Sequence, residues 1–190
     1  MTECIVFDFE TNGFGDSSVL SISAIRLQAK YKKKIMGKRI IFKETKCYCR
    51  FYYPTEKFNY HAIKVNGLTS SEINKRRGNH NYPENFIDDQ DSLKEFFNNA
   101  CLYVAHNISF DSSFIPFGIP EEKQYCTMMN LSSLCGKRPK LSEAAENLNI
   151  RYNPNILHDS KEDARLCFKI FEKMANMPQI NQEIHRKLKI

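Results

Sequence analysis

The organising segment of this chain is Ile5-Val6-Phe7-Asp8-Phe9-Glu10-Thr11-Asn12-Gly13, an apolar run that carries two carboxylates and ends in a turn. Because side chains alternate along a strand, Asp8 and Glu10 are expected on one face, with Phe7 and Phe9 on the other, buried face. Two carboxylates this close repel each other unless a cation lies between them. Oxygen ligands suit Mg²⁺ or Mn²⁺ better than zinc, so the segment predicts a divalent metal site.

A calcium loop of the EF-hand type is the alternative interpretation, because four of its places are matched by Asp8, Glu10, Asn12 and Gly13. The twelfth place of such a loop needs a bidentate Glu, and this chain has Val19 there. The residues that precede Asp8 also favour a strand over an entering helix. We therefore prefer the two-carboxylate strand to the calcium loop.

Length and composition predict one domain. The chain has 190 residues, of which 42% are hydrophobic, and no Gly/Ser/Pro linker divides it, so we expect a single domain over residues 1–177 and a short basic tail at residues 178–190. A formal charge of +6 suits a polyanionic partner but indicates nucleic acid only weakly. The 7 cysteines lack paired CxxC spacing, which favours reduced thiols. No segment resembles a signal peptide or a membrane span, so we expect a cytoplasmic protein without membrane contact.

Hydrophobic patterning predicts a mixed sheet. Alternating residues indicate strands at 19–27 and 39–53, joined by a hairpin with a basic tip at 30–39. Exposure for solubility is the simpler interpretation of this tip, and phosphate contact is the alternative. The continuous apolar run 101–105 is typical of a buried parallel strand, and 124–128 predicts a fifth strand.

Helices are expected between and after these strands. The apolar residues Leu93, Phe96 and Phe97 recur at helical spacing, which predicts an amphipathic helix at 88–99. Thr69 or Ser70 is the expected N-cap of a short helix between the third and fourth strands. Further helices are predicted at 109–115, 129–135, 141–147 and 161–174, with a short basic helix in the tail.

Two more clusters of acids follow in the sequence. Asp111 comes just after the buried strand, at the carboxyl end where an open α/β sheet places its site, although an Asp at a helix start is also a common cap. The run from His158 to Asp163 is rich in titratable groups. Within it, Asp159 with Glu162 is explained by N-terminal capping of the following helix.

With these acidic sites in order, the chain resembles the DEDDh branch of the DnaQ-like 3′–5′ exonucleases. The first motif is matched by residues 8–14, the second by residues 104–111, and the third by His158 with Asp163-Ala164. Residues 61–69 and 139–145 also resemble the family, so the similarity extends over about residues 4 to 175. Departures are Asn12, Phe14 and Ser160, which stand where threonine, leucine and alanine are common.

The resemblance implies the roles of the site residues. It makes His158 the general base and assigns two divalent cations, Mg²⁺ or Mn²⁺, to four carboxylates: Asp8, Glu10, Asp111 and Asp163. The chemistry agrees, because two ions about 3.5–4 Å apart can clamp the attacking and leaving oxygens of a phosphodiester. An imidazole can also accept a proton near neutral pH.

The resemblance also implies a site for the terminal nucleotide. The residues expected there are Thr11, Asn12, Gly13, Phe14, Asn107 and Phe110. Phe14, in a turn flanked by glycine, is the preferred stacking residue, because every base offers a π-face to an aromatic ring. Phe110 is at least as well explained as a core aromatic.

Together these observations predict an α/β, ribonuclease H-like fold, with a mixed five-stranded sheet and helices on both faces. The expected function is a metal-dependent 3′–5′ exonuclease, with residues 1–177 as its exonuclease domain, that releases nucleoside 5′-monophosphates from the 3′ end of single-stranded DNA. The alternatives are an exoribonuclease acting on short RNA or RNA 3′ ends, and a catalytically silent nucleic-acid-binding module. The intact acids and His158 argue against the silent module. The expected partner is nucleic acid with a free 3′ end, and a DNA polymerase is a candidate partner in proofreading or DNA repair.

Overall fold

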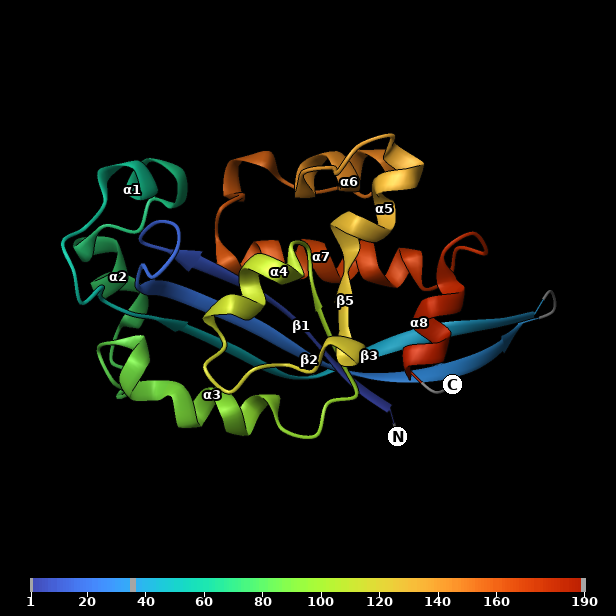
Figure 1. Cartoon of the computed structure of the whole chain (residues 1–190), viewed down its shortest axis with the longest axis horizontal. Helices are drawn as coiled ribbons and strands as arrows, with labels where there is room; N and C mark the ends of the chain where they lie inside the picture. Colours follow the sequence, from blue (N-terminus) through green and yellow to red (C-terminus); the bar gives the residue numbers. More distant parts are fainter. Residues whose placement is uncertain (1, 35–36, 189–190) are drawn as a thin grey trace.

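One mixed sheet organises the molecule (Figure 1). The computed structural model describes residues 2–34 and 37–188, without the side chains of residues 33–38. The strands lie in the order β3-β2-β1-β4-β5, and β1 is antiparallel to β2 but parallel to β4, which is in turn parallel to β5. Their bounds are β1 Thr2–Thr11, β2 Val19–Lys34, β3 Gly37–Phe51, β4 Leu102–Ala105 and β5 Gln124–Cys126. The predicted mixed five-stranded sheet is confirmed.

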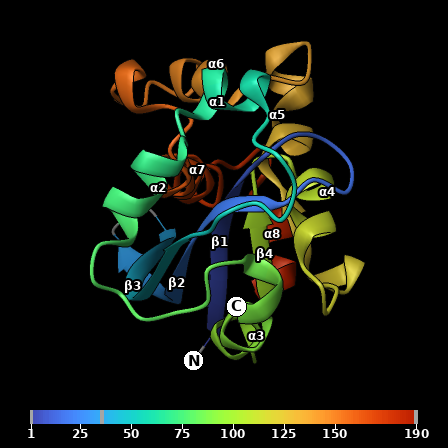
Figure 2. The same ribbon diagram turned by 90° about the vertical axis from the view of Figure 1, so that its left-hand side faces the viewer.

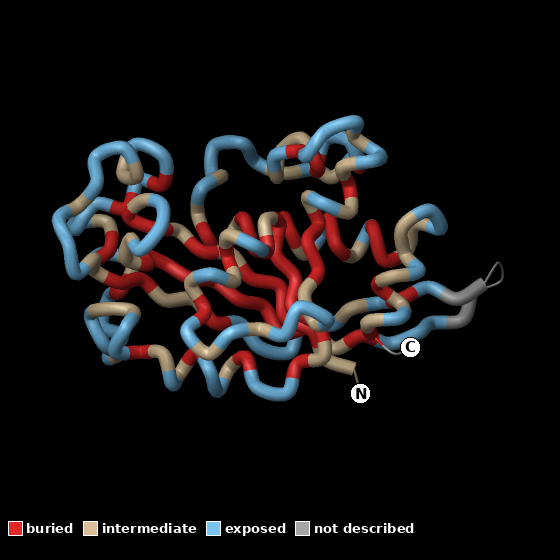
Figure 3. Tube along the Cα trace, in the orientation of Figure 1, coloured by how far each residue is buried: buried red, intermediate tan, exposed pale blue. Residues whose placement is uncertain are grey.

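Helices cover both faces of this sheet (Figure 2). One face packs against α3 (Gln90–Phe97) and α4 (Ile108–Asp111). The other face packs against α5 (Thr127–Cys135), α6 (Leu141–Asn147), α7 (Ser160–Met174) and α8 (Asn181–Leu188). Buried residues concentrate in β1, β4 and α7 between these layers (Figure 3).

The alternating directions of side chains along β1 determine which face of the sheet carries the carboxylates. Phe7 and Phe9 pack with the α3 side of the sheet, whereas Cys4 and Val6 pack with the α7 side. Because the period of a strand is two, Asp8 continues the Cys4 and Val6 row. The first pair of acids therefore points toward α7.

Two short helices lie between β3 and α3, beside the carboxyl end of β1 (Figure 1). They are α1 (Tyr60–Asn66) and α2 (Ser70–Arg77). Thr69 is the N-cap of α2, and its hydroxyl accepts a hydrogen bond from the Glu72 N–H at 3.1 Å. Arg77 is buried and donates to the carbonyl of Phe51 at 2.7 Å, which fixes α2 to the end of β3.

The hairpin β2–β3 is longer than the sequence predicts. Lys30 and Lys32, expected in the turn, lie within β2 and pair with residues of β3. The reason is that the opposite face of this ribbon is apolar: Ala29 and Ile40 are buried in the same cluster as α8, so strand pairing continues beyond Leu27. Residues 35–36 of the expected tip at 30–39 lie outside the described residues.

Two helices late in the sequence complete the core. The N-cap of α7 is Asp159, whose Oδ1 accepts from the N–H groups of Lys161 at 3.0 Å and Glu162 at 3.3 Å. In α8, Ile184 and Leu188 are fully buried. Among the helices of the described ranges, none combines the length and apolarity that crossing a bilayer requires.

Candidate active site

The carboxyl end of β1 extends past its parallel neighbour. Pairing with β4 ends at Val6, so Asp8 and Glu10 lie beyond β4 and pair only with β2. The short helix α4 turns back over this free edge, where the Phe9 N–H donates to Asp111 Oδ1 at 3.2 Å. Asp111 is 3% exposed. The third acid is thereby fastened to the strand that carries the first two.

The first turn of α7 brings in the fourth acid. Asp163 Oδ2 accepts from the His158 N–H at 3.0 Å, while Asp163 Oδ1 is buried without a hydrogen-bond partner among the described residues. One oxygen of Glu10, one oxygen of Asp163 and one ring nitrogen of His158 lie within 4.8 Å of one another. Residues from opposite ends of the sequence therefore meet at one point.

His158 lies on the loop before α7 rather than in the helix. Its side chain is exposed, and its backbone has a φ of 66°, in the left-handed region. This conformation costs a non-glycine residue about 1–2 kcal/mol, so surrounding contacts must maintain it. The hydrogen bond from its N–H to Asp163 is one such contact.

Burial and mutual repulsion disturb the titration of the acids on β1. The pKa of Asp8 lies well above its ordinary value, first because of burial and then because of the charges of Asp111 and Glu10. Burial and the charge of Asp163 raise the pKa of Glu10 to about 8, against a hydrogen bond from Asn66. The protein alone therefore resists ionising this pair at neutral pH.

The pKa values of Asp111 and Asp163, the two acids carried by helices, are raised by smaller amounts. Burial raises the pKa of Asp111 to about 7, although the hydrogen bond from the Phe9 N–H opposes the shift. Burial also raises the pKa of Asp163 to about 6, against the hydrogen bond from the His158 N–H. A divalent cation would reverse these shifts by replacing repulsion with attraction. The hard oxygen donors and the unpartnered Asp163 Oδ1 fit such an ion.

A small pocket lies directly beside Glu10. Its volume is about 290 Å³, close to the lower end of the ~300–1,000 Å³ typical of ligand sites. At its edge the Phe14 ring is 91% exposed and stands edge-on to Phe110, with the ring centroids 6.4 Å apart. The lining residues are Phe9, Glu10, Thr11, Gly13, Phe14 and Phe110, together with Asn59, His61, Ala62, Val65 and Asn66 from the α1 region.

Two of the predicted nucleotide-binding residues lie outside this lining. Asn12 is buried, and its side-chain amide donates to Glu56 Oε1 at 2.8 Å and to the Lys57 carbonyl at 2.9 Å. Asn107 starts α4, where its carbonyl accepts from the Asp111 N–H at 3.1 Å. Asn12 thus fastens the loop before α1, and Asn107 orients the helix that carries Asp111.

Gly13 lies close to two polar side chains beside the pocket. A Cβ atom at Gly13 would lie 2.8 Å from Ser17 Oγ and 3.2 Å from Asn59 Nδ2. The Thr11 hydroxyl donates to the Gly13 carbonyl at 2.6 Å and tightens the same turn. A side chain at residue 13 would therefore require the Ser17 hydroxyl and the Asn59 amide to move aside.

The α1 wall of the pocket was not predicted. The sequence alone predicts no nucleotide-binding role for His61, Ala62, Val65 or Asn66. Asn66 is buried and donates to the Thr11 carbonyl at 3.2 Å, which attaches α1 to the end of β1. The signal available in the sequence was the resemblance of residues 61–69 to the exonuclease family.

Comparisons with known proteins extend these findings. The sequence matches the model of the RNase T exonuclease family over residues 5–171. No curated protein matches it significantly. The fold is similar to that of exonuclease X in complex with 5′-overhanging duplex DNA, with a TM-score of 0.57, 19% identity, and coverage of 97% of this chain and 99% of that one.

Two further solved structures share the fold. For E. coli exonuclease I in complex with a dA16 oligonucleotide, the TM-score is 0.68 at 13% identity, over 98% of this chain and 43% of that one. For a 3′-exonuclease described in 3′-end-specific recognition of the histone mRNA stem-loop, the TM-score is 0.59 at 12% identity, over 90% of this chain and 80% of that one. This chain thus spans less than half of exonuclease I.

The likenesses to solved structures confirm the predicted ribonuclease H-like fold. The family match covers the acids from Asp8 to Asp163, and exonucleases of this family use divalent metal ions, which the cluster around Glu10 fits. The chain belongs to the RNase T exonuclease family and is a 3′–5′ exonuclease of the DEDDh type that acts on nucleic acid.

Proposed function

We propose that this protein removes nucleoside 5′-monophosphates from the 3′ end of single-stranded DNA, with Mg²⁺ or Mn²⁺ as its metal. The observation that carries the proposal is the juxtaposition of the acids with the pocket. Glu10 belongs both to the acidic cluster and to the pocket lining. A nucleotide held in the pocket would therefore present its phosphodiester to the acids.

The acids hold the metals in this proposal. Asp8, Glu10, Asp111 and Asp163 supply oxygen ligands to two cations, which when bound neutralise charge on the reacting phosphate. His158 accepts a proton from the attacking water at a ring nitrogen. The water oxygen forms a bond to phosphorus, and the bond from phosphorus to the 3′ oxygen of the preceding nucleotide breaks. That oxygen takes a proton from solvent, so the shortened strand ends in a 3′ hydroxyl. The exposed position of His158 allows the proton to pass on to solvent.

The pocket selects a chain end without reading its sequence. Phe14 offers an exposed ring for stacking, and Phe110 supports it from the side. Stacking of this kind contributes about 1–3 kcal/mol per base and tolerates every base. The loop that closes the pocket is held by Asn12, so this residue acts on the nucleotide only through the loop.

RNA is the second candidate substrate. It is favoured by one observation, the shared fold with a 3′-exonuclease whose described target is a histone mRNA stem-loop. The decisive experiment digests matched DNA and RNA strands, labelled at either the 3′ or the 5′ end, with Mg²⁺ and with a chelator as control. Immediate release of labelled mononucleotide from 3′-labelled DNA, abolished by the chelator, is the expected result. Faster release from RNA would establish an exoribonuclease instead, and binding without release would establish a silent module.

Cellular context forms part of the same proposal. We place the enzyme in the cytoplasm, because the lack of paired CxxC spacing among its 7 cysteines suits a reducing compartment. A DNA polymerase is the candidate partner, in proofreading or repair. Co-elution of the purified protein with a polymerase on gel filtration, tested with and without a primer–template, would support this partnership, and separate elution in both conditions would contradict it.

A further inference from the structure

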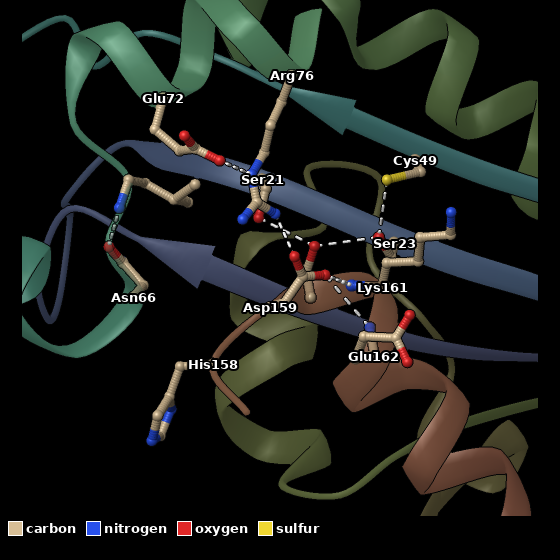
Figure 4. Close-up of polar contacts among 12 residues, drawn as sticks. Ser21, Ser23, Cys49, Asn66, Glu72, Arg76, His158, Asp159, Lys161 and Glu162 are labelled. Atoms are coloured by element: carbon tan, nitrogen blue, oxygen red, sulfur yellow. Dashed lines mark hydrogen bonds and ion pairs between the residues drawn. The ribbon is translucent and has the colours of Figure 1, made fainter. Parts of the chain in front are cut away.

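The loop that carries His158 needs support beyond its own helix. We define the His158 loop as residues 157–159. The left-handed backbone of His158 and its exposed side chain leave the imidazole dependent on neighbouring contacts for its position. One contact comes from Asp163 through the His158 N–H at 3.0 Å. The other comes through the next residue, Asp159 (Figure 4).

Asp159 uses its two carboxylate oxygens for different purposes. Its Oδ1 caps α7 by accepting from the Lys161 and Glu162 N–H groups. Its Oδ2 accepts from Arg76 Nη1, a residue of α2 that is 83 positions away in the sequence. Capping requires only one oxygen, so the ion pair with Arg76 is additional to what α7 needs.

Arg76 is itself held from two sides. Its Nε donates to Glu72 Oε1 at 2.7 Å, one helical turn earlier, and its guanidinium lies 5.2 Å from the centre of the Phe51 ring. A planar guanidinium fixed by a carboxylate and a ring has little freedom left. Among the ion pairs of residues 2–34 and 37–188, the Arg76–Asp159 pair is the one that joins the α1–α2 segment to the start of α7.

We propose that Arg76 is a positioning residue for catalysis, which holds the His158 loop over the acidic cluster from α2. The inference rests on the proposed role of His158. The α1–α2 segment forms a wall of the nucleotide pocket through Asn66, so the same segment holds the terminal nucleotide and the loop of the base. A small displacement of a reacting group can lower the rate by about 10²-fold. Arg76 therefore affects turnover rather than the binding of metal or nucleotide.

The test uses two variants that remove the ion pair from either side. Arg76→Met keeps an apolar stem against Phe51, and Asp159→Asn keeps an oxygen for the N-cap. Each is expected to lower kcat on a 3′-labelled oligonucleotide by ~10- to 100-fold. KM and the Mg²⁺ concentration at half-saturation should stay within about 2-fold of wild type, and Tm within about 2 °C. The double variant should be no slower than the slower single variant, because both changes remove one interaction. Lys75→Met, at the neighbouring exposed residue, is the control and should turn over as wild type does.

A double-mutant cycle between Arg76 and His158 distinguishes this inference from the proposed function. In a His158→Ala background, Arg76→Met should cause no further loss of kcat, because its effect passes through His158. An equal further loss would show that Arg76 acts elsewhere and would overturn the inference. Wild-type turnover by Arg76→Met, with His158→Ala slow, would overturn it as well while leaving the proposed function intact. Wild-type turnover by His158→Ala would instead remove the proposed base. A loss of Tm that parallels the loss of kcat in both single variants would reduce Arg76 to a stabilising residue.

Discussion

The two ends of the long strands carry opposite charges in opposite environments. At the carboxyl end of β1, Asp8 and Glu10 meet acids from two helices, and burial and repulsion raise their pKa values. At the far end of the ribbon β2–β3, the strand register places Lys30, Lys32 and Lys43 on one solvent-exposed face. The acidic end buries its charges at a cost in stability, whereas the lysines of the basic end remain exposed to solvent and cost little. Only the acidic end has the concentrated, poorly screened charge that metal-dependent hydrolysis requires.

The largest expected effect comes from removing one acid. Asp8→Asn should lose all measurable hydrolysis and keep its fold, because Asp8 interacts electrostatically with all three other acids and no neighbour can replace it. Hydrolysis in saturating Mg²⁺ and melting without metal are the measurements. Asp88→Asn, at an exposed acid outside the cluster, is the matched control. Substantial Mg²⁺-dependent hydrolysis by folded Asp8→Asn would mean that the acidic end is not the site of hydrolysis.

The next effect separates the base from the metal ligands. His158→Ala should lower turnover by ~10²–10⁴-fold, as expected for loss of a positioned base. Mg²⁺ titrations should remain near wild type. His80→Ala, at another exposed histidine, is the control. Loss of Mg²⁺ affinity in His158→Ala would make His158 a metal ligand instead of the base.

A third prediction concerns how the stability of the metal-free protein changes with pH. Because the folded pKa values of Glu10 and Asp163 are raised to about 8 and about 6, the folded state binds more protons than the unfolded state between about pH 4 and pH 8. The metal-free protein should therefore lose stability as pH rises through this window. We expect Tm in chelator to be lower at about pH 8 than at about pH 5.5, and Mg²⁺ to raise Tm more at the higher pH. Equal melting temperatures at both pH values would mean that burial and repulsion do not raise the pKa values of these acids in the folded protein.

The smallest expected effect lies at the basic end. Replacing Lys30, Lys32 and Lys43 with Gln should make the salt dependence of oligonucleotide binding shallower, by a log–log slope of up to ~0.7 for each phosphate that the ribbon no longer binds. Hydrolysis of a trinucleotide, too short to reach from the acids to the ribbon, should be unchanged. A triple replacement of exposed lysines elsewhere, Lys94, Lys169 and Lys173, is the control. The same slope in both triple variants would assign the ribbon to solubility.

Part of the acidic end was predictable, because two of its signals are local. The strand of residues 5–11 was predicted from the alternation of rings and acids, and Asp111 from its place after a buried strand. The α1 wall was not predictable in the same way, because Asn66 reaches Thr11 across 55 residues of sequence. The Arg76–Asp159 pair spans 83 residues, and no periodicity connects its members. The length of the ribbon was missed because Ala29 and Ile40 are buried in a cluster with residues of α8, which is distant in the sequence.

The position of α8 has a consequence for how the protein is made. Ile184 and Leu188 belong to the same apolar layer as Cys4 and Val6, so β1 lies in a layer that is completed by a helix synthesised much later than the strand. Contacts of such long sequence separation form late, because loop closure must precede them. While a ribosome still holds residues 181–188, this face of the nascent sheet lacks the part of its cover that α8 provides, and a chaperone that binds exposed apolar strands would find a target there. Ribosome-bound chains stalled before and after the emergence of α8 should thus differ sharply in their resistance to protease.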